Sequence, residues 1–484
     1  MSLLWMMLSC TRPEAVPAAQ AEPAEQQAAA PTQSEDAAVA GPVTSPAPRK
    51  YNVVVITADT LRGDMLPVNG NTELYTPHLD RLAAEGVNFS RAYTPITTTL
   101  PAHASLLSSL YPSDHRAFSN VSAISSRITT LPEVLKPQGW RTAAHLNMPW
   151  LNPEVSGVPQ GIQDIRRGDH VRKADKTLPW VNDYIQGRAG KDEPFFLWVH
   201  FVDNHTPYHA PAAYDSFYFD GEKGDPGEVS MEEIWDLFPR DHQQSEHFLR
   251  WVDGVESADY ITGTYKGSLT WLDQHIGLMI RELQAAGEWE DTIFVFTADH
   301  GESLGEHGLW FVHGGLYEGT THIPLIIRVP DGPKGVNVER VVSLVDVAPT
   351  VLARNGIEAP EAFRGTDLWS YLDAPGPGGA ALLEHTGRQL EGVVTERYKL
   401  IRHLKTTRIY AGYPMDEGTI ELYDLQADPG ELNNLAAGQP ELVEELSGLI
   451  DALKEGKVEE YEALRGNIDA EINEQLKALG YFEE

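Results

Sequence analysis

The stretch Asp291-Thr-Ile-Phe-Val-Phe-Thr-Ala-Asp299-His300-Gly301-Glu302 decides how the rest of the chain is interpreted. Its β-branched and aromatic residues form a short apolar run, which is typical of a strand buried on both faces of a parallel sheet. An acid, a histidine and a glycine follow at once. Because open α/β sheets keep their sites at the carboxyl ends of their strands, this run predicts a strand that delivers polar ligands to a site.

Two more apolar runs end in the same way. Val53-Val-Val-Ile-Thr57 leads to Asp59, and Phe195-Phe-Leu-Trp-Val leads into His200, Asp203 and His205. Each run alone could be an ordinary strand whose polar end meets water. Three such ends in one chain favour a shared site with metal ligands.

A helix is expected to begin close to Thr99. Pro101 suits the first turn of a helix, and Leu106, Leu107 and Leu110 supply a buried face. Thr99 then lies at or just before the helix N-terminus, where backbone N–H groups and the helix dipole favour a bound anion. A threonine that only caps the helix is the alternative.

Other parts of the folded chain have simpler patterns. The spacing of apolar residues predicts a long amphipathic helix from Ala258 to Ala286. The glycine-rich stretch from Gly305 through His313 to Glu318 indicates an active-site loop. Residues 215–255 are acidic and irregular, and we expect them to form a peripheral insertion that shapes a substrate mouth.

The last hundred residues have the pattern of a separate antiparallel sheet. Strands are expected around Val393–Arg402 and Glu421–Leu425, with a turn at Asp428–Gly430 and a closing helix from Pro440 to Lys454. The predicted organisation is therefore a catalytic domain at 51–380 and a smaller antiparallel C-terminal subdomain with closing helices at 381–484.

The charge of the chain limits its partners. Among 484 residues, 71 acids face 37 bases, for a net charge of -34. Nucleic acid is not expected as a partner because phosphate backbones require a basic face. An anionic small substrate stays open, since a metal ion can reverse the charge locally.

The first residues predict export. The apolar run Leu3–Leu8 precedes Cys10, the only cysteine, and resembles a bacterial lipoprotein signal at 1–10 that is cut before a lipidated cysteine. Residues 11–50 are rich in Ala, Pro, Gln and Glu, as in a disordered tether. We expect a periplasmic or cell-surface lipoprotein that is held to a membrane by its lipid alone. A free thiol without a role is the alternative.

Taken in order, the motifs of the chain resemble those of the sulfatase family in the alkaline phosphatase superfamily. The resemblance covers Tyr51 to Leu435 and rests on the segments Asn52–Arg62, Thr99–Leu107, His200–His205, Ala298–Glu302, the loop through His313 and Tyr317-Glu318, Leu344–Thr350 and Glu421–Glu431. It implies a three-layer α/β fold with a mostly parallel central sheet.

The resemblance also implies a metal site. Asp59 and Asp299 match metal-binding aspartates, whereas Thr60 stands where the family usually has a second aspartate. His300 stands where calcium-type sulfatases commonly have asparagine and where zinc- or manganese-type relatives have histidine. An imidazole ligand favours zinc or manganese, although calcium stays possible.

The remaining site residues follow from the same resemblance. His205 and His313 match positions that bind the substrate anion or protonate its leaving group. His103 is assigned to catalysis beside Thr99, and Arg62 and His200 are assigned to substrate binding.

The nucleophile departs from the family. Most sulfatases have Cys-x-Pro-x-Arg or Ser-x-Pro-x-Arg and oxidise the first residue to formylglycine, whereas this chain has Thr99-Leu-Pro101-Ala-His103. Oxidised threonine would be a ketone. Threonine is the nucleophile of phosphodiesterase and phosphoethanolamine-transferase relatives, and a metal that binds Thr99 could remove its proton.

The interpretation that follows is a metal-dependent hydrolase. Its substrate would be a sulfate, phosphate or phosphonate ester of a small molecule, a glycan or a lipid. Two alternatives stay open: a transferase that passes a phosphoryl group to a lipid or sugar acceptor, and a non-catalytic binding protein that has lost the chemistry.

Overall fold

The computed structural model describes residues 49–168, 173–208, 210–215, 217–238, 240–373, 379–406, 415–455, 461–470 and 472–473. Cys10 and the predicted tether up to residue 48 lie outside the described residues. Within the described ranges, no helix combines the length and the apolar character that a membrane span requires.

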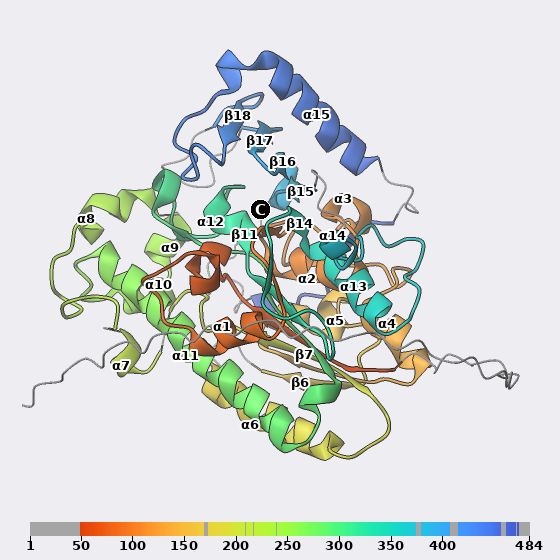
Figure 1. Ribbon diagram of the computed structural model, residues 1–484. Coiled ribbons are helices and arrows are strands. Elements are labelled where there is room, and N and C mark those ends of the chain that lie inside the picture. Colours follow the sequence, from red (N-terminus) through yellow and green to blue (C-terminus); the bar gives the residue numbers. More distant parts are fainter. Residues whose placement is uncertain are drawn as a thin grey trace, which may run out of the picture. The chain divides into compact units, whose positions relative to one another are not determined.

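Eight strands form the central sheet, in the order β13-β2-β12-β8-β1-β7-β5-β6 (Figure 1). Their bounds are β1 Asn52–Ala58, β2 Val87–Phe89, β5 Arg141–Leu146, β6 Asp164–Arg167, β7 Phe195–Phe201, β8 Thr292–Ala298, β12 Leu325–Arg328 and β13 Val336–Val338. Among these strands only β12 runs antiparallel to its neighbours β8 and β2. The predicted mostly parallel sheet is therefore confirmed.

The three apolar runs that end in polar residues lie side by side. Strand β1 pairs with β7 on one side and with β8 on the other, and every residue of all three strands is buried. Ala58 is opposite both Phe201 and Ala298, so the residues that follow these positions leave the sheet at one level. This register brings the three strand ends to one place.

Helices cover both faces of the sheet (Figure 1). Helix α11 (Ala258–Ala285) packs with α6 (Ala174–Arg188) and α1 (Pro77–Ala84), and it ends within one residue of its predicted end. On the other side, α2 (Thr99–Ser108) packs with α13 (Val347–Arg354). This is the three-layer α/β architecture that the sequence predicts.

Shorter elements complete this part of the chain. The remaining helices are α3 Pro112–His115, α4 Leu131–Leu135, α5 Pro153–Ser156, α7 Ala212–Asp215, α8 Met231–Ile234, α9 Arg240–Gln244, α10 Glu246–Val252, α12 Glu318–Thr321 and α14 Ser370–Asp373. Small sheets are formed by β3 Ala92–Tyr93, β11 His322–Ile323 and β14 Val342–Ser343, by β9 Ser303–Leu304 and β10 Trp310–Val312, and by β4 Ser122–Ala123 and β19 Leu464–Arg465.

A separate antiparallel sheet follows, in the order β15-β16-β17-β18 (Figure 1). Its strands are β15 Ala380–Glu384, β16 Leu390–Thr395, β17 Tyr398–His403 and β18 Ile420–Asp424. The segment expected to form strands around Val393–Arg402 is a hairpin that turns at Glu396 and Arg397. Helix α15 (Pro440–Lys454) has the predicted bounds and packs on the sheet through Leu446 and Ile450.

The acidic segment 215–255 is more ordered than the sequence analysis expects. It contains α8, α9 and α10, and the side chains of Ser230 and Ser245 cap α8 and α10. Phe238 and Trp251 lie with ring centroids 6.3 and 6.1 Å from that of Phe311, in strand β10 just before His313. Serine caps and aromatic contacts thus accompany short helices that the composition alone does not show, and the role of the segment as a peripheral insertion that shapes a substrate mouth stays a prediction.

Candidate functional site

The site is built where the central strands end. Asp59 follows β1, and Asp299 and His300 follow β8; one ligand atom of each lies within 4.8 Å of the others. His300 Nε2 is 3.8 Å from Asp59 Oδ1 and 3.6 Å from Asp299 Oδ2. The structure thus brings together the three residues that the sequence predicts as metal ligands.

The atoms of this group lack protein partners. Both carboxylate oxygens of Asp59, Asp299 Oδ2 and His300 Nε2 are buried, and none has a hydrogen-bond partner among the described residues. Buried polar atoms are normally satisfied, so several unsatisfied atoms facing one point indicate a missing ligand. Two carboxylates and an imidazole form a donor set that fits zinc or manganese.

The electrostatics support the same fit. Burial raises the pKa of Asp59 to about 7, and burial together with Asp59 raises the pKa of Asp299 well above its usual range. Burial also lowers the pKa of His300 well below its usual range, so the imidazole is neutral. Two adjacent buried carboxylates ionise readily only beside a cation, which the neutral imidazole does not supply.

Thr99 is the first residue of α2, as predicted, and Thr98 precedes it as the N-cap residue. Its hydroxyl is buried and has no hydrogen-bond partner among the described residues. One helical turn later, His103 Nδ1 lies 2.7 Å from the Thr99 carbonyl oxygen and 3.9 Å from Asp299 Oδ2. The first turn of α2 therefore abuts the metal-ligand group.

Thr60 does not replace the missing aspartate. Its backbone is in the left-handed region, with φ of 56°, and its hydroxyl donates a hydrogen bond to the carbonyl oxygen of Asn204. Its backbone N–H donates to Asp299 Oδ1 over 3.2 Å. Thr60 thus orients Asp299 through its main chain.

Two histidines lie on the open side of this group. The ring centroid of His313 is 4.7 Å from that of His300 and 5.9 Å from that of His205. Burial lowers the pKa of His313, but the nearby Glu302 carboxylate outweighs this effect and leaves the pKa above its ordinary value. His313 Nδ1 is 3.4 Å from Glu302 Oε2, and the Tyr208 hydroxyl donates to Glu302 Oε1.

His103 and His200 lie deeper in the same site. Both contact the Thr57 hydroxyl, through His103 Nε2 at 3.0 Å and His200 Nδ1 at 3.1 Å. Burial lowers the pKa of His200 to about 4 and that of His103 well below its usual range. Neither ring is exposed, since each has 0% of its surface accessible.

Arg62 is engaged elsewhere. Its guanidinium is buried and forms ion pairs with Asp64 at 2.8 Å and with Glu306 at 2.7 Å. Its positive charge is thus already shared between two carboxylates. A role in substrate binding stays a prediction for Arg62, as do the individual roles of the other site residues.

Several neighbours of the site carry no recognisable sequence signal. Lys173 donates to the carbonyl oxygens of Val202 and Pro207, and its charge acts on Asp59. Between β15 and β16, burial lowers the pKa of His385 to about 4, with a smaller contribution from the nearby His403 and His313 rings. Thr386 contacts Thr98 through the two hydroxyls. Only the fold brings these residues to the site.

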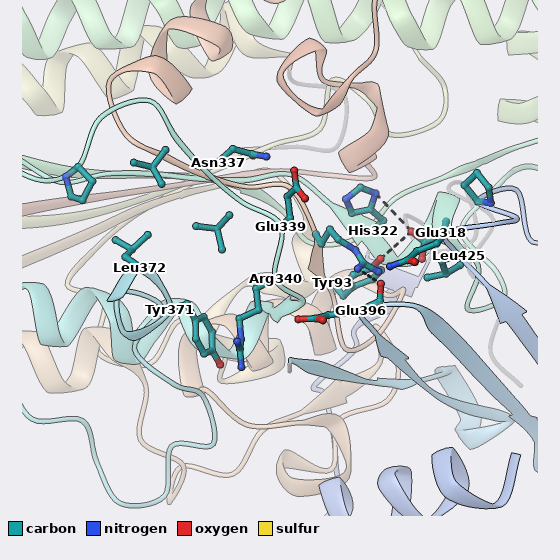
Figure 2. Close-up of a pocket in the computed structure, with 16 residues that line it drawn as sticks. Tyr93, Glu318, His322, Asn337, Glu339, Arg340, Tyr371, Leu372, Glu396 and Leu425 are labelled. Atoms are coloured by element: carbon teal, nitrogen blue, oxygen red, sulfur yellow. Dashed lines mark hydrogen bonds and ion pairs between the residues drawn. The ribbon is translucent and has the colours of Figure 1, made fainter. Parts of the chain in front are cut away.

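A separate cavity of about 1030 Å³ lies between the sheet edge and the antiparallel sheet (Figure 2). Arg340 lies over the ring of Tyr371 on one side of it, and Glu318 lies beside His322 on the other. None of the predicted site residues is among the described residues that line this cavity. The strand-end cluster, not this cavity, is therefore the candidate site.

Comparison with known proteins agrees with this geometry. The sulfatase family model matches residues 51–357, and a model of the C-terminal part of N-sulphoglucosamine sulphohydrolase matches residues 305–458. An ulvan-active sulfatase of Formosa agariphila is 28% identical over 470 residues, which cover 90% of this chain and 82% of that protein.

Two further relatives widen the group. A multifunctional alkaline phosphatase superfamily protein of Trinickia caryophylli is 26% identical and covers 81% of this chain and 92% of its own. The crystal structure of a phosphonate monoester hydrolase of Agrobacterium radiobacter superposes with a TM-score of 0.66 and 24% identity, over 84% of this chain and 95% of that one. The chain therefore belongs to the sulfatase family of ester hydrolases, within the alkaline phosphatase superfamily.

Proposed function

We propose that this protein is a metal-dependent hydrolase of sulfate, phosphate or phosphonate esters and that Thr99 is its nucleophile. The observation that carries the proposal is the position of Thr99, whose unpartnered hydroxyl begins α2 where this helix abuts Asp299. Asp59, Asp299, His300 and Thr99 would hold the ion. When bound, the ion lowers the pKa of the hydroxyl and offsets the charge of the transferred group.

The residues of the chain account for the other parts of the reaction. Thr99 Oγ1 attacks the central sulfur or phosphorus, and the bond from that atom to the leaving oxygen breaks. In the first turn of α2, the Leu100 N–H donates to Asn120 Oδ1 and Pro101 has no N–H, which leaves the Thr99 N–H to stabilise an anionic oxygen. His313, whose pKa Glu302 raises, donates the proton to the leaving oxygen, and His205 binds the anion beside it. The Thr99 hydroxyl proton goes to solvent before the attack. Water then cleaves the Thr99 ester: its hydroxide joins the central atom, its proton restores His313, and the Thr99 oxygen leaves as the alkoxide.

The organic part of the substrate is proposed by class. The names of the relatives include an ulvan-active sulfatase, and the second family model is that of N-sulphoglucosamine sulphohydrolase. The second name contains a sulfated amino sugar, which supports a sugar derivative as the organic part of the substrate. Thr386, in the connection between β15 and β16, reaches the start of α2 and would contact that part of the substrate.

A parallel assay tests the proposal. The purified full-length chain is analysed for metal and assayed on aryl sulfate, aryl phosphate, phosphodiester and phosphonate monoester. We expect turnover of at least one ester, its loss on chelation, and its recovery with zinc or manganese. Undiminished turnover after complete metal removal would contradict the proposal. Product formation only when an alcohol acceptor is present would identify a transferase instead.

Replacement of Asp299 tests the ligand set. Asp299→Ala should lose the bound metal and the activity while the fold is kept, because the aspartate lies at the end of an otherwise apolar strand. Metal content by mass spectrometry and circular dichroism measure the two effects. Asp273→Asn is the matched control, since Asp273 is a buried carboxylate that contacts α1 instead of the site. Full metal occupancy in Asp299→Ala would refute the assignment.

A further inference from the structure

We infer that His200 is a further protein ligand of the ion, through its Nε2 atom. The inference rests on the proposed metal-dependent function and extends its ligand set of Asp59, Asp299, His300 and Thr99. It gives His200 a different role from the substrate binding that the sequence analysis expects.

The position of His200 follows from the sheet. Thr57 on β1 is paired with His200 on β7. Side chains two residues apart on a strand point to the same side, so Thr57 and Asp59 both face the His200 ring. His200 Nε2 is buried, has no hydrogen-bond partner among the described residues, and lies 3.4 Å from Asp59 Oδ2.

The spacing suits coordination by one ion. The distances from His200 Nε2 to Asp59, from His300 Nε2 to Asp299 and from His300 Nε2 to Asp59 are 3.4, 3.6 and 3.8 Å. Bonds of about 2.1 Å from zinc to nitrogen or oxygen place neighbouring ligands of a tetrahedron about 3.4 Å apart. His200 Nε2 thus lies at ligand spacing from Asp59 Oδ2, whereas His300 Nε2 lies beside Oδ1 of the same carboxylate, and a ligand atom of His200 also lies within 4.8 Å of one of Asp299.

Hydrogen bonds decide which His200 nitrogen carries the hydrogen. The hydrogen positions on the neighbouring His103 ring come first, because both rings contact Thr57. His103 Nδ1 lies 2.7 Å from the Thr99 carbonyl oxygen, which only accepts, so Nδ1 carries a hydrogen. The neutral ring then has a lone pair on Nε2. The Thr57 hydroxyl, 3.0 Å away, donates its one hydrogen to that lone pair.

The Thr57 hydroxyl oxygen can then only accept further hydrogen bonds. Trp198 Nε1–H donates to it over 3.1 Å, and His200 Nδ1 lies at 3.1 Å on another side. His200 Nδ1 must therefore be the second donor. In the tautomer that has its hydrogen on Nδ1, Nε2 has a lone pair, which faces Asp59 Oδ2 at 3.4 Å. Both atoms are therefore placed to coordinate one cation.

His103 provides a matched control. Its ring lies 4.6 Å from that of His200, between centroids, and is equally buried. Both of its nitrogens are used, however, one toward the Thr99 carbonyl and one toward Thr57. His103 is therefore a positioning residue, and its removal leaves the number of imidazole ligands unchanged.

The number of imidazoles on bound zinc tests the inference without any activity measurement. The full-length protein and its His200→Ala and His103→Ala variants are stripped of metal and loaded with zinc. X-ray absorption at the zinc edge should count two imidazoles in the wild type, two in His103→Ala and one in His200→Ala. Zinc affinity, measured by competition with a chromophoric chelator, should fall more than about 100-fold in His200→Ala, beyond the loss typical of an outer-shell change.

Each result has one meaning. A single imidazole in the wild type, or unchanged zinc affinity in a folded His200→Ala variant, overturns the inference and leaves the proposed function standing. A wild type that binds none of zinc, manganese and calcium overturns the proposed function itself. Circular dichroism of the zinc-free forms establishes folding. If His200→Ala does not fold, the wild-type count decides alone.

Discussion

The methyl group of Thr99 makes its alcohol secondary, so its oxidation would give a ketone and not the formylglycine aldehyde. This difference bears on which ester the protein can turn over. A formylglycine hydrate releases its sulfate by expelling it as the aldehyde re-forms, whereas an unmodified alkoxide has no such route. A Thr99 ester must instead be cleaved by water at the central atom. We therefore expect phosphoester turnover to exceed sulfate-ester turnover.

Substitution of Thr99 separates direct attack from other routes. Thr99→Ala should lower kcat by about 10³-fold or more, as expected when a covalent nucleophile is removed. Thr99→Ser should keep appreciable activity because the hydroxyl and its metal contact survive. Mass spectrometry after rapid quench should find the transferred group on Thr99. Wild-type activity in Thr99→Ala would instead indicate attack by water or by Thr97 or Thr98.

At the residue scale, the sequence predicted the positions of site residues where polar side chains come directly after a strand. Asp59, Asp299 and His300 come straight after apolar runs, so their clustering could be predicted from the parallel order of the strands. The role of Thr57 could not, because it depends on which side chain is opposite it on a strand 143 residues away. No sequence pattern within β1 or β7 indicates how the two strands are aligned.

Among the elements, α1 depends on a carboxylate from α11. Asp273 Oδ1 accepts hydrogen bonds from the backbone N–H groups of Leu79 at 2.8 Å and His78 at 3.1 Å. Asp273 is fully buried, and burial raises its pKa to about 7 although these hydrogen bonds lower it. The start of α1 is therefore held by a group whose charged form is disfavoured.

The free energy of unfolding should depend on pH because the charged form of Asp273 is disfavoured in the folded state. Unfolded Asp273 ionises near pH 4, so between about pH 4 and pH 7 the folded state binds more protons, and stability falls as the pH rises. Asp273→Asn removes this effect. The free energy of unfolding of the variant relative to wild type should rise by up to about 4 kcal/mol from pH 4 to pH 8, measured by urea unfolding. A difference that does not change with pH would contradict the assignment.

Some elements could be predicted from the sequence pattern and others could not. The amphipathic spacing that predicted α11 is strong because it extends over many turns. Helices α8, α9 and α10 were not predicted, since each is too short to show periodicity and depends on contacts such as those of Phe238 with Phe311. Likewise, nothing in the composition of β12 reveals that it runs against its neighbours.

For the whole molecule, a buried lysine joins the antiparallel sheet to the catalytic part. Lys399 on β17 is fully buried and pairs with Glu318 on α12 at 2.7 Å and with Glu431 at 2.8 Å. The Tyr93 hydroxyl also donates to Glu318, which faces the cavity in Figure 2. Behind Glu318, the Thr320 carbonyl accepts from the N–H of Gly301, next to the predicted ligand His300.

Removal of Lys399 should destabilise the protein more than a surface change would. Lys399→Met removes the lysine charge between two carboxylates, and we expect a loss of about 3 kcal/mol in the free energy of unfolding, since Glu318 is partly exposed. The triple variant Lys399→Met with Glu318→Gln and Glu431→Gln should recover most of it. Urea unfolding measures both. A triple variant as unstable as the single one would show that packing, not charge, is lost.

We also propose that the mature protein is anchored by a lipid on Cys10. The apolar run before this cysteine and the low-complexity tether after it support the proposal. Labelled fatty acid should enter the wild type in cells and should be absent from Cys10→Ala, with the labelled protein in the membrane fraction. Equal labelling of both forms, or of neither, would count against it.

The distances along the chain between the proposed metal ligands would decide when an ion can bind. Thr60, the neighbour of Asp59, and Asp299 are joined by a hydrogen bond and are 239 residues apart. A chain emerging from the ribosome has no complete site until β8 has been synthesised and has inserted beside β1. Closing so long a loop is slow, so the ion arrives late in folding and cannot nucleate it. The metal supply of the compartment in which the chain finishes folding, not of the one in which its synthesis starts, therefore selects the ion.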